Sequence, residues 1–114
     1  MTNPLKGETQ ITLGNETYNC RLTIDSLIKI EEEIGMGVIK LINRLSNEFD
    51  MPIKDQLVIL YHALRGGGND FDHKKIKSLV VENGLIQTTQ VILLMLTSTL
   101  NDEENTEKKD EEVA

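Results

Sequence analysis

The sequence of 114 residues is poor in cysteine and in aromatic residues. It contains one cysteine, no tryptophan, two tyrosines and two phenylalanines. The lone Cys20 cannot form an internal disulfide, which favours a reducing compartment. No run of about 18 apolar residues could span a membrane, and no basic segment followed by an apolar one resembles an export signal. We therefore expect a cytoplasmic protein with no membrane partner.

Basic residues are also scarce, because 12 lysines and arginines face 19 acidic residues and give a net charge of -7. Residues 101–114 hold seven of the acidic residues and two of the lysines, so -5 of this charge lies in the tail and -2 in the rest. A nearly neutral domain with few aromatic residues lacks the basic surface that binds nucleic acids. We predict one globular domain at residues 1–100 and a disordered acidic tail at residues 101–114. The tail is either a solubilising segment or a docking site for a basic partner.

Two short segments near the N-terminus alternate polar and apolar side chains, as strands with one buried face do. They are residues 8–13 and residues 17–24, the second with Tyr18, Cys20, Leu22 and Ile24 on one face. Between them, Gly14 and Asn15 tolerate the positive φ values of a tight hairpin turn. Two strands alone are marginally stable in water, so the apolar face of this hairpin must pack on helices.

The remaining apolar residues recur at helical spacing in about five segments. Thr23 and Asp72 are good helix N-caps, Pro52 suits a first helical turn, and Gly35 and Gly84 can end helices. The third helix carries its apolar residues at Ile53, Leu57, Leu60, Tyr61 and Leu64, and the fifth runs from Leu85 to about Leu100. The predicted fold class is α+β, mostly α, with an N-terminal β-hairpin packed on a bundle of about five helices.

The stretch HALRGGGNDFD, residues 62–72, raises the possibility of a phosphate loop or a calcium loop. A phosphate loop needs a Gly-Lys-Ser/Thr sequence between a strand and a helix, whereas these glycines follow a helix. A calcium loop beginning at Asp70 would place Lys74 and Lys75 where an oxygen ligand and a glycine belong. We interpret the element Leu64, Arg65, Gly66, Gly67 and Gly68 as a hinge whose glycines end the helix with positive φ.

Nothing in the sequence predicts a metal, a cofactor or an enzyme. The carboxylates of residues 31–33 fan out around a helix and cannot converge on one ligand, which favours a solvated face. His62 and His73 are the only histidines, and no serine or cysteine lies in a recognisable nucleophile motif. Lys74, Lys75 and Lys77 are either surface charges or a contact for an acidic partner.

The segment VILLML, residues 91–96, is apolar on every side of its helix, unlike the single stripe of a surface helix. Six such side chains, at about 1.5–3 kcal/mol each when buried, are too apolar to leave in water. Two alternatives remain, a central place in the core and burial against another chain. In the second, Val91, Leu93, Leu94 and Leu96 are the candidate partner-binding residues.

Five motifs occur in an order that resembles the small tail proteins of gene transfer agents and related prophages. They are NPLKGE at 3–8, YNCRLTIDSLIKIEEEIG at 18–35, LRGGG at 64–68, the polar cap after it, and ENGLIQTTQVILLML at 82–96. The matching positions are Asn3, Pro4, Gly7, Glu8, Leu64, Arg65, Gly66, Gly67 and Gly68, with Glu31 after Ile30 as an apolar-Glu pair. The resemblance covers residues 3–100 and leaves out the acidic tail.

The resemblance implies a role in assembling phage-like tails in the bacterial cytoplasm. Proteins of this kind are labelled tail tube proteins, yet tubes grow by stacking β-sheets and this sequence predicts mostly helices. Their gene usually precedes that of the tape-measure protein, as the genes of tail assembly chaperones do. The resemblance thus implies a non-enzymatic, homo-oligomeric chaperone for the tape-measure protein that helps tail tube subunits gather on it. The alternative is a structural tail tube subunit.

Overall fold

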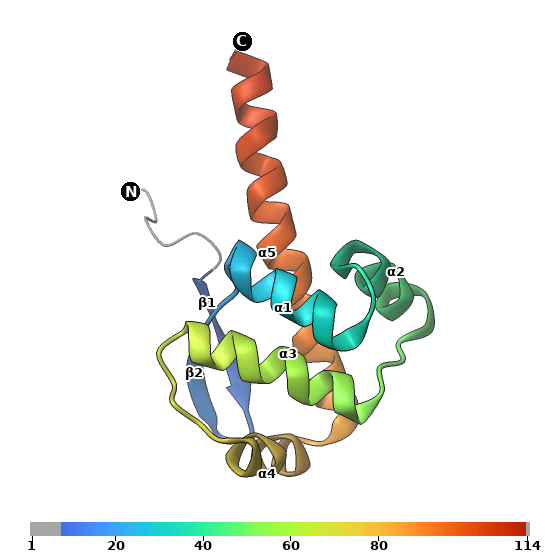
Figure 1. The fold of residues 1–114 in the computed structure, drawn as a ribbon. Helices are drawn as coiled ribbons and strands as arrows, with labels where there is room; N and C mark the ends of the chain where they lie inside the picture. The colour runs from blue at the N-terminus through green and yellow to red at the C-terminus, as the bar shows by residue number, and fades with distance from the viewer. Residues whose placement is uncertain (1–7, 114) are drawn as a thin grey trace.

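The structure is a computed structural model that describes the backbone of residues 8–113 and the side chains of residues 8–100. Asn3, Pro4 and Gly7 of the first motif lie outside the described residues. The elements are β1 (Glu8–Leu13), β2 (Glu16–Arg21), α1 (Ile24–Ile34), α2 (Val38–Glu48), α3 (Ile53–Gly66), α4 (His73–Asn83) and α5 (Leu85–Val113). The predicted fold class, a hairpin packed on about five helices, is confirmed (Figure 1).

The hairpin has a polar outer face and an apolar inner face. β1 and β2 are antiparallel, with Leu13 opposite Glu16 across the turn, and Gly14 has a φ of 67°. Asn15 is not among the residues with positive φ, so only the glycine of the predicted pair needs that freedom. Ile11, Leu13 and Cys20 are buried beneath the sheet. On the outer face, cross-strand side chains pair with each other, as Gln10 with Asn19 and Thr12 with Thr17.

The predicted helix ends are mostly where the sequence placed them. The Thr23 hydroxyl accepts a hydrogen bond from the Ser26 amide at 3.0 Å, and the Asp72 carboxylate accepts one from the Lys75 amide at 2.8 Å. The expectation that Ile24 continues the inner face of the strand is wrong. Thr23 already caps α1, so Ile24 is the first residue of that helix and is 58% exposed.

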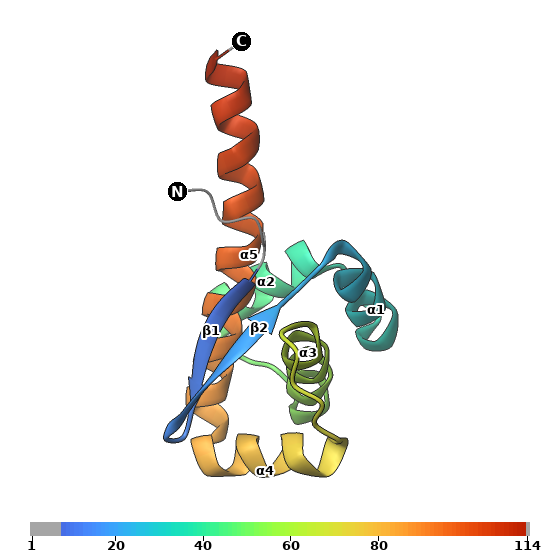
Figure 2. The same cartoon turned by 90° about the vertical axis from the view of Figure 1, so that its left-hand side faces the viewer.

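Helix α3 lies at the centre of the domain. It packs against β2, α1, α4 and α5, while α4 crosses the base of the molecule near the hairpin turn (Figure 2). A hydrogen bond of 3.0 Å from the Gly14 amide to the Asn83 side chain ties the turn to the end of α4. The fully buried residues of α3 are Ile59, Leu60, Ala63 and Leu64. Ile53 was expected on this inner stripe, but it begins the helix at the edge of the core and is 52% exposed.

Helix α5 continues beyond its expected end at about Leu100. Its backbone is helical to Val113, and its last part projects away from the rest of the domain (Figures 1 and 2). The side chains of residues 101–114 lie outside the described residues. The disorder that composition predicts for this segment stays a prediction.

Deleting residues 101–114 is expected to change the melting temperature of the domain by no more than about 2 °C. The segment is rich in like charge and poor in apolar residues, so it can add little buried apolar surface to the domain. Calorimetry on the full chain and on the truncated chain measures this difference. A loss of several degrees would show that the tail packs on the domain.

Burial controls the chemistry of Cys20, which is completely inaccessible on β2. Desolvation raises the pKa of its thiol from 9.0 to about 12. At pH 8 only about one thiol in 10⁴ is then the reactive thiolate, so modification by a thiol reagent should be far slower in the native protein than in urea. The unfolded state loses its thiol proton at lower pH, so stability should fall as pH rises from about 9 to about 12. Equally rapid modification of the native and unfolded protein would contradict the burial.

Candidate partner-binding surface

The four candidate partner-binding residues of α5 fall into different environments. Leu96 is completely buried, Val91 and Leu93 are partly buried against the core, and Leu94 is 63% exposed. Successive helical residues are about 100° apart, so an apolar run of six must place side chains on all sides of the helix. Leu96 belongs to the core of this chain, and Leu94 is the one of the four that keeps most of its surface.

A groove of about 420 Å³ lies between β1 and the exposed side of α5. The residues of α5 on its wall follow the spacing i, i+3, i+4 and i+7, which is one face of a helix. The residues of β1 on its other wall are consecutive, so they belong to both faces of the strand. The groove therefore runs along the strand instead of lying on one of its faces. Its lining is Thr9, Gln10, Ile11, Thr12, Val91, Leu94, Met95 and Ser98, with no charged side chain.

A second groove, of about 430 Å³, opens where the start of α3, the end of α4 and the start of α5 meet. Its lining is Ile53, Leu57, Lys77, Val80, Val81 and Leu85. Val81 is 78% exposed, and Ile53 and Leu85 are also exposed. We refer to these six residues as the apolar corner. Sequence periodicity did not predict this corner. The available signal was Val81, because two consecutive valines in a helix cannot both face the core.

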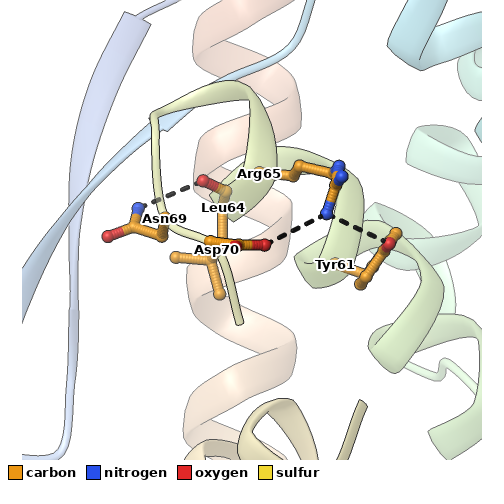
Figure 3. Close-up of polar contacts among 5 residues, drawn as sticks. All are labelled: Tyr61, Leu64, Arg65, Asn69 and Asp70. Carbon is orange, nitrogen blue, oxygen red and sulfur yellow. Dashed lines mark hydrogen bonds and ion pairs between the residues drawn. The ribbon is translucent and has the colours of Figure 1, made fainter. Parts of the chain in front are cut away.

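The Leu64–Gly68 element ends α3 with a Schellman motif. The Gly68 amide donates to the Arg65 carbonyl at 3.0 Å, and the Asn69 amide donates to the Leu64 carbonyl at 2.9 Å. The Asn69 side chain donates to the same Leu64 carbonyl at 3.1 Å (Figure 3). It also donates to the Asn19 carbonyl of β2 at 2.7 Å. Asn69 therefore joins the end of α3 to the hairpin, a contact that the sequence did not reveal.

The three glycines of this element have two different roles. Only Gly68 has positive φ, at 97°, so the expectation of positive φ at Gly66 and Gly67 is wrong. A Cβ atom at Gly66 would overlap the Arg21 carbonyl oxygen, and one at Gly67 would overlap the Asn19 carbonyl oxygen. These two glycines let the backbone of α3 lie directly against the backbone of β2, so the element is a packing joint as well as a helix end.

The side chain of Arg65 points away from this joint toward the surface. Its guanidinium lies 3.4 Å from the Tyr61 hydroxyl and 3.5 Å from the Asp70 carboxylate, both long for hydrogen bonds (Figure 3). The Tyr61 ring also stacks on His73 with centroids 4.7 Å apart. The surrounding hollow combines two cations with two carboxylates, as its lining is Tyr61, Arg65, Asp70, Phe71, Asp72, His73 and Lys75. This balance of charge does not select an anionic or a cationic ligand.

Two of the three consecutive glutamates make specific contacts, so their interpretation as only a solvated face is wrong. Glu31 accepts a hydrogen bond from the Val38 amide at 2.9 Å and thereby caps α2. Glu33 lies 2.7 Å from Nε2 of His62 on α3. Both contacts arise from the fold and not from spacing within one helix. Within the described part of the chain, no group of three metal-ligating side chains comes together.

The sequence of this chain matches the model of one protein family. The family model described as "Phage tail tube protein, GTA-gp10" matches residues 6–102, which is most of the chain. The chain belongs to this tail protein family. The resemblance to small tail proteins of gene transfer agents and prophages is therefore confirmed, and the acidic tail lies almost entirely outside the match. Comparisons with curated proteins and with solved structures gave no match.

For this member of the tail protein family, the structure explains the Leu-Arg-Gly-Gly-Gly element through packing. Leu64 is fully buried, and the first two glycines allow the close approach of the strand backbone, as described above.

Among the described residues, no single helix is long and apolar enough to cross a membrane. The pair formed by α4 and residues 85–100 passes that test by length and composition, with a bend of 108° between its halves.

Proposed function

We propose that this member of the tail protein family is a tail assembly chaperone for the tape-measure protein, acting in the bacterial cytoplasm without catalysing a reaction. The observation that carries the proposal is the apolar corner, an uncovered groove on a domain of this size. Its walls are almost wholly aliphatic, and its most exposed aliphatic member, Val81, follows the buried Val80 on α4. Surfaces of this kind mark protein-binding sites.

The chemistry of the corner favours an apolar helical segment as the partner. Its three walls come from three helices, and helix-in-groove binding uses a stripe of apolar residues on the guest. Lys77 is the charged residue of the lining, so an acidic side chain beside the apolar stripe would be favoured. A chaperone that covers such stripes would keep a long tape-measure protein from aggregating until tail tube subunits gather on it. We also propose that the protein self-associates.

The alternative function is a structural tail tube subunit, which the name of the family favours. A tube that grows by stacked sheets needs extensive β-structure, whereas the described residues contain one sheet of two strands. This difference supports the chaperone. Detection of the protein in purified particles at the high copy number of a tube subunit would overturn the chaperone proposal and support the tail tube alternative.

Coexpression with the tape-measure protein of the same phage-like element tests the proposal. The wild-type chain should keep apolar tape-measure segments soluble and co-purify with them. Val81→Glu should weaken this binding at least about tenfold, because a charge would be desolvated in the interface.

The matched control is Ser78→Glu, which adds the same charge at an exposed position of the same helix outside the corner. It should bind like the wild type. Equal binding by both variants, or no binding by the folded wild type, would contradict the proposal.

A further inference from the structure

Among the described residues, one edge of β1 has no strand beside it. Within residues 8–100 the sheet contains only β1 and β2, and no other backbone segment hydrogen-bonds to β1. In a hairpin with a two-residue turn, the residues flanking the turn form a bonded pair, and the bonded positions then alternate. Leu13, Ile11 and Thr9 therefore bond to β2, while the N–H and C=O groups of Gln10 and Thr12 point to the open edge.

Within the part of the chain that the structure describes, this open edge lacks the usual protection against pairing with another chain. Edge strands are normally blocked by lysine, proline, a bulge or a covering element. Residues 9–13 contain no lysine or proline, and the register from Glu8 to Leu13 runs without a bulge. The groove beside the edge is uncharged, and its helical wall contains the exposed Leu94. The same face thus leaves backbone polar groups and an apolar side chain without partners among the described residues.

We propose that the β1 edge of one molecule pairs antiparallel with the β1 edge of a second copy, forming a continuous sheet of four strands across a two-fold axis. This inference gives a surface to the self-association proposed above and does not depend on the tape-measure protein as client. A two-fold contact must be complementary to itself.

The strand meets this requirement. With Gln10 opposite the partner's Gln10, Glu8 lies opposite the partner's Thr12, so no like charges face each other. Both strands of the new pair then present outward-directed backbone groups to each other. The second copy also closes the groove, and its strand covers the exposed Leu94. A second copy is favoured over an unrelated extended peptide because it supplies a strand that is uncharged at residues 9–13 and presents matching outward-directed backbone groups.

The substitution Gln10→Pro tests this pairing directly. The Gln10 amide points to the open edge, so Gln10→Pro removes a donor needed for pairing with a second copy and leaves the ladder to β2 intact. The control Gln10→Thr keeps the backbone N–H and the strand propensity of the position. Like the proline variant, it loses the hydrogen bond from the Gln10 side chain to Asn19. Leu94→Lys, on the other wall, tests the same interface without touching the strand.

Sedimentation equilibrium over a range of concentrations should show dimers for the wild type and for Gln10→Thr. Gln10→Pro and Leu94→Lys should each raise the dimer dissociation constant at least about tenfold, with circular dichroism confirming that each variant is folded. If Gln10→Pro does not fold, Leu94→Lys decides. A folded wild type that is monomeric at every concentration, or a folded Leu94→Lys variant that dimerises like the wild type, overturns the inference.

The result can be separated from a failure of the proposed chaperone function. Val81→Glu lies in the apolar corner, outside the β1 groove, and should dimerise like the wild type while losing the client. A monomeric wild type that still binds tape-measure segments would overturn the strand pairing and leave the chaperone proposal standing. A dimer that binds no tape-measure segment would support the strand pairing and overturn the chaperone proposal.

Discussion

Replacing Gly67 with alanine is expected to destabilise the domain by about 3 kcal/mol or more. The added Cβ would overlap the Asn19 carbonyl oxygen and lie 2.7 Å from the Cys20 nitrogen, closer than real Cβ contacts allow. Overpacking usually costs about 1–3 kcal/mol when side chains can move aside. Here the obstructing atoms belong to the backbone of β2, so α3 and the hairpin must separate. Urea denaturation of the two proteins measures the loss.

Gly68→Ala is the matched control for this prediction. Gly68 has a φ of 97°, but a Cβ there would meet no atom within 4 Å. Its substitution therefore brings backbone strain without a steric overlap, and should cost only about 1 kcal/mol. If the two alanine variants lose the same stability, the glycines serve chain conformation alone and the packing joint is wrong.

Local features of the sequence predicted the ends of elements well. The caps at Thr23 and Asp72 are confirmed because a side-chain oxygen and an amide three residues later are brought together by the helix itself. Gly35 and Gly84 have positive φ for a similarly local reason, since each follows the last residue of a helix. Such features need no knowledge of what the helix packs on.

Features that depend on the approach of distant elements could not be predicted in this way. Gly66 and Gly67 were expected to need positive φ, and their actual constraint is a strand more than 40 residues earlier in the chain. Glu33 and His62 are 29 residues apart and meet only because α1 packs on α3. Periodicity assigns an apolar face to each helix, but it does not say which neighbour will approach that face or how closely.

The same limit applies to the partner surface. Leu94 and Leu96 are the same residue type in one continuous apolar run, and only the packing of other elements on α5 makes one exposed and the other buried. The apolar corner is a property of three helix ends brought together, so no single segment encodes it. The sequence therefore identified α5 as important for both core and surface, while the division between the two required the fold.

Leu96→Ala should be among the most destabilising substitutions in α5, at about 2–5 kcal/mol. Leu96 is completely buried, and its removal would lose the transfer free energy of the side chain and leave a cavity that the surrounding core fills only in part. In a domain of about 100 residues this corresponds to a fall in melting temperature of at least about 10 °C. Thermal and urea unfolding should agree on the loss.

The control for this last prediction is Ile86→Ala, which shortens an aliphatic side chain in the same helix. Ile86 is 72% exposed, so little buried surface is lost, and alanine is the better helix former. Its stability should stay within about 0.5 kcal/mol of the wild type. A comparable loss at both positions would mean that the first turn of α5 is buried in solution by a contact the single chain does not make. A small loss at Leu96 would instead contradict its place in the core and restore it as a partner-binding residue.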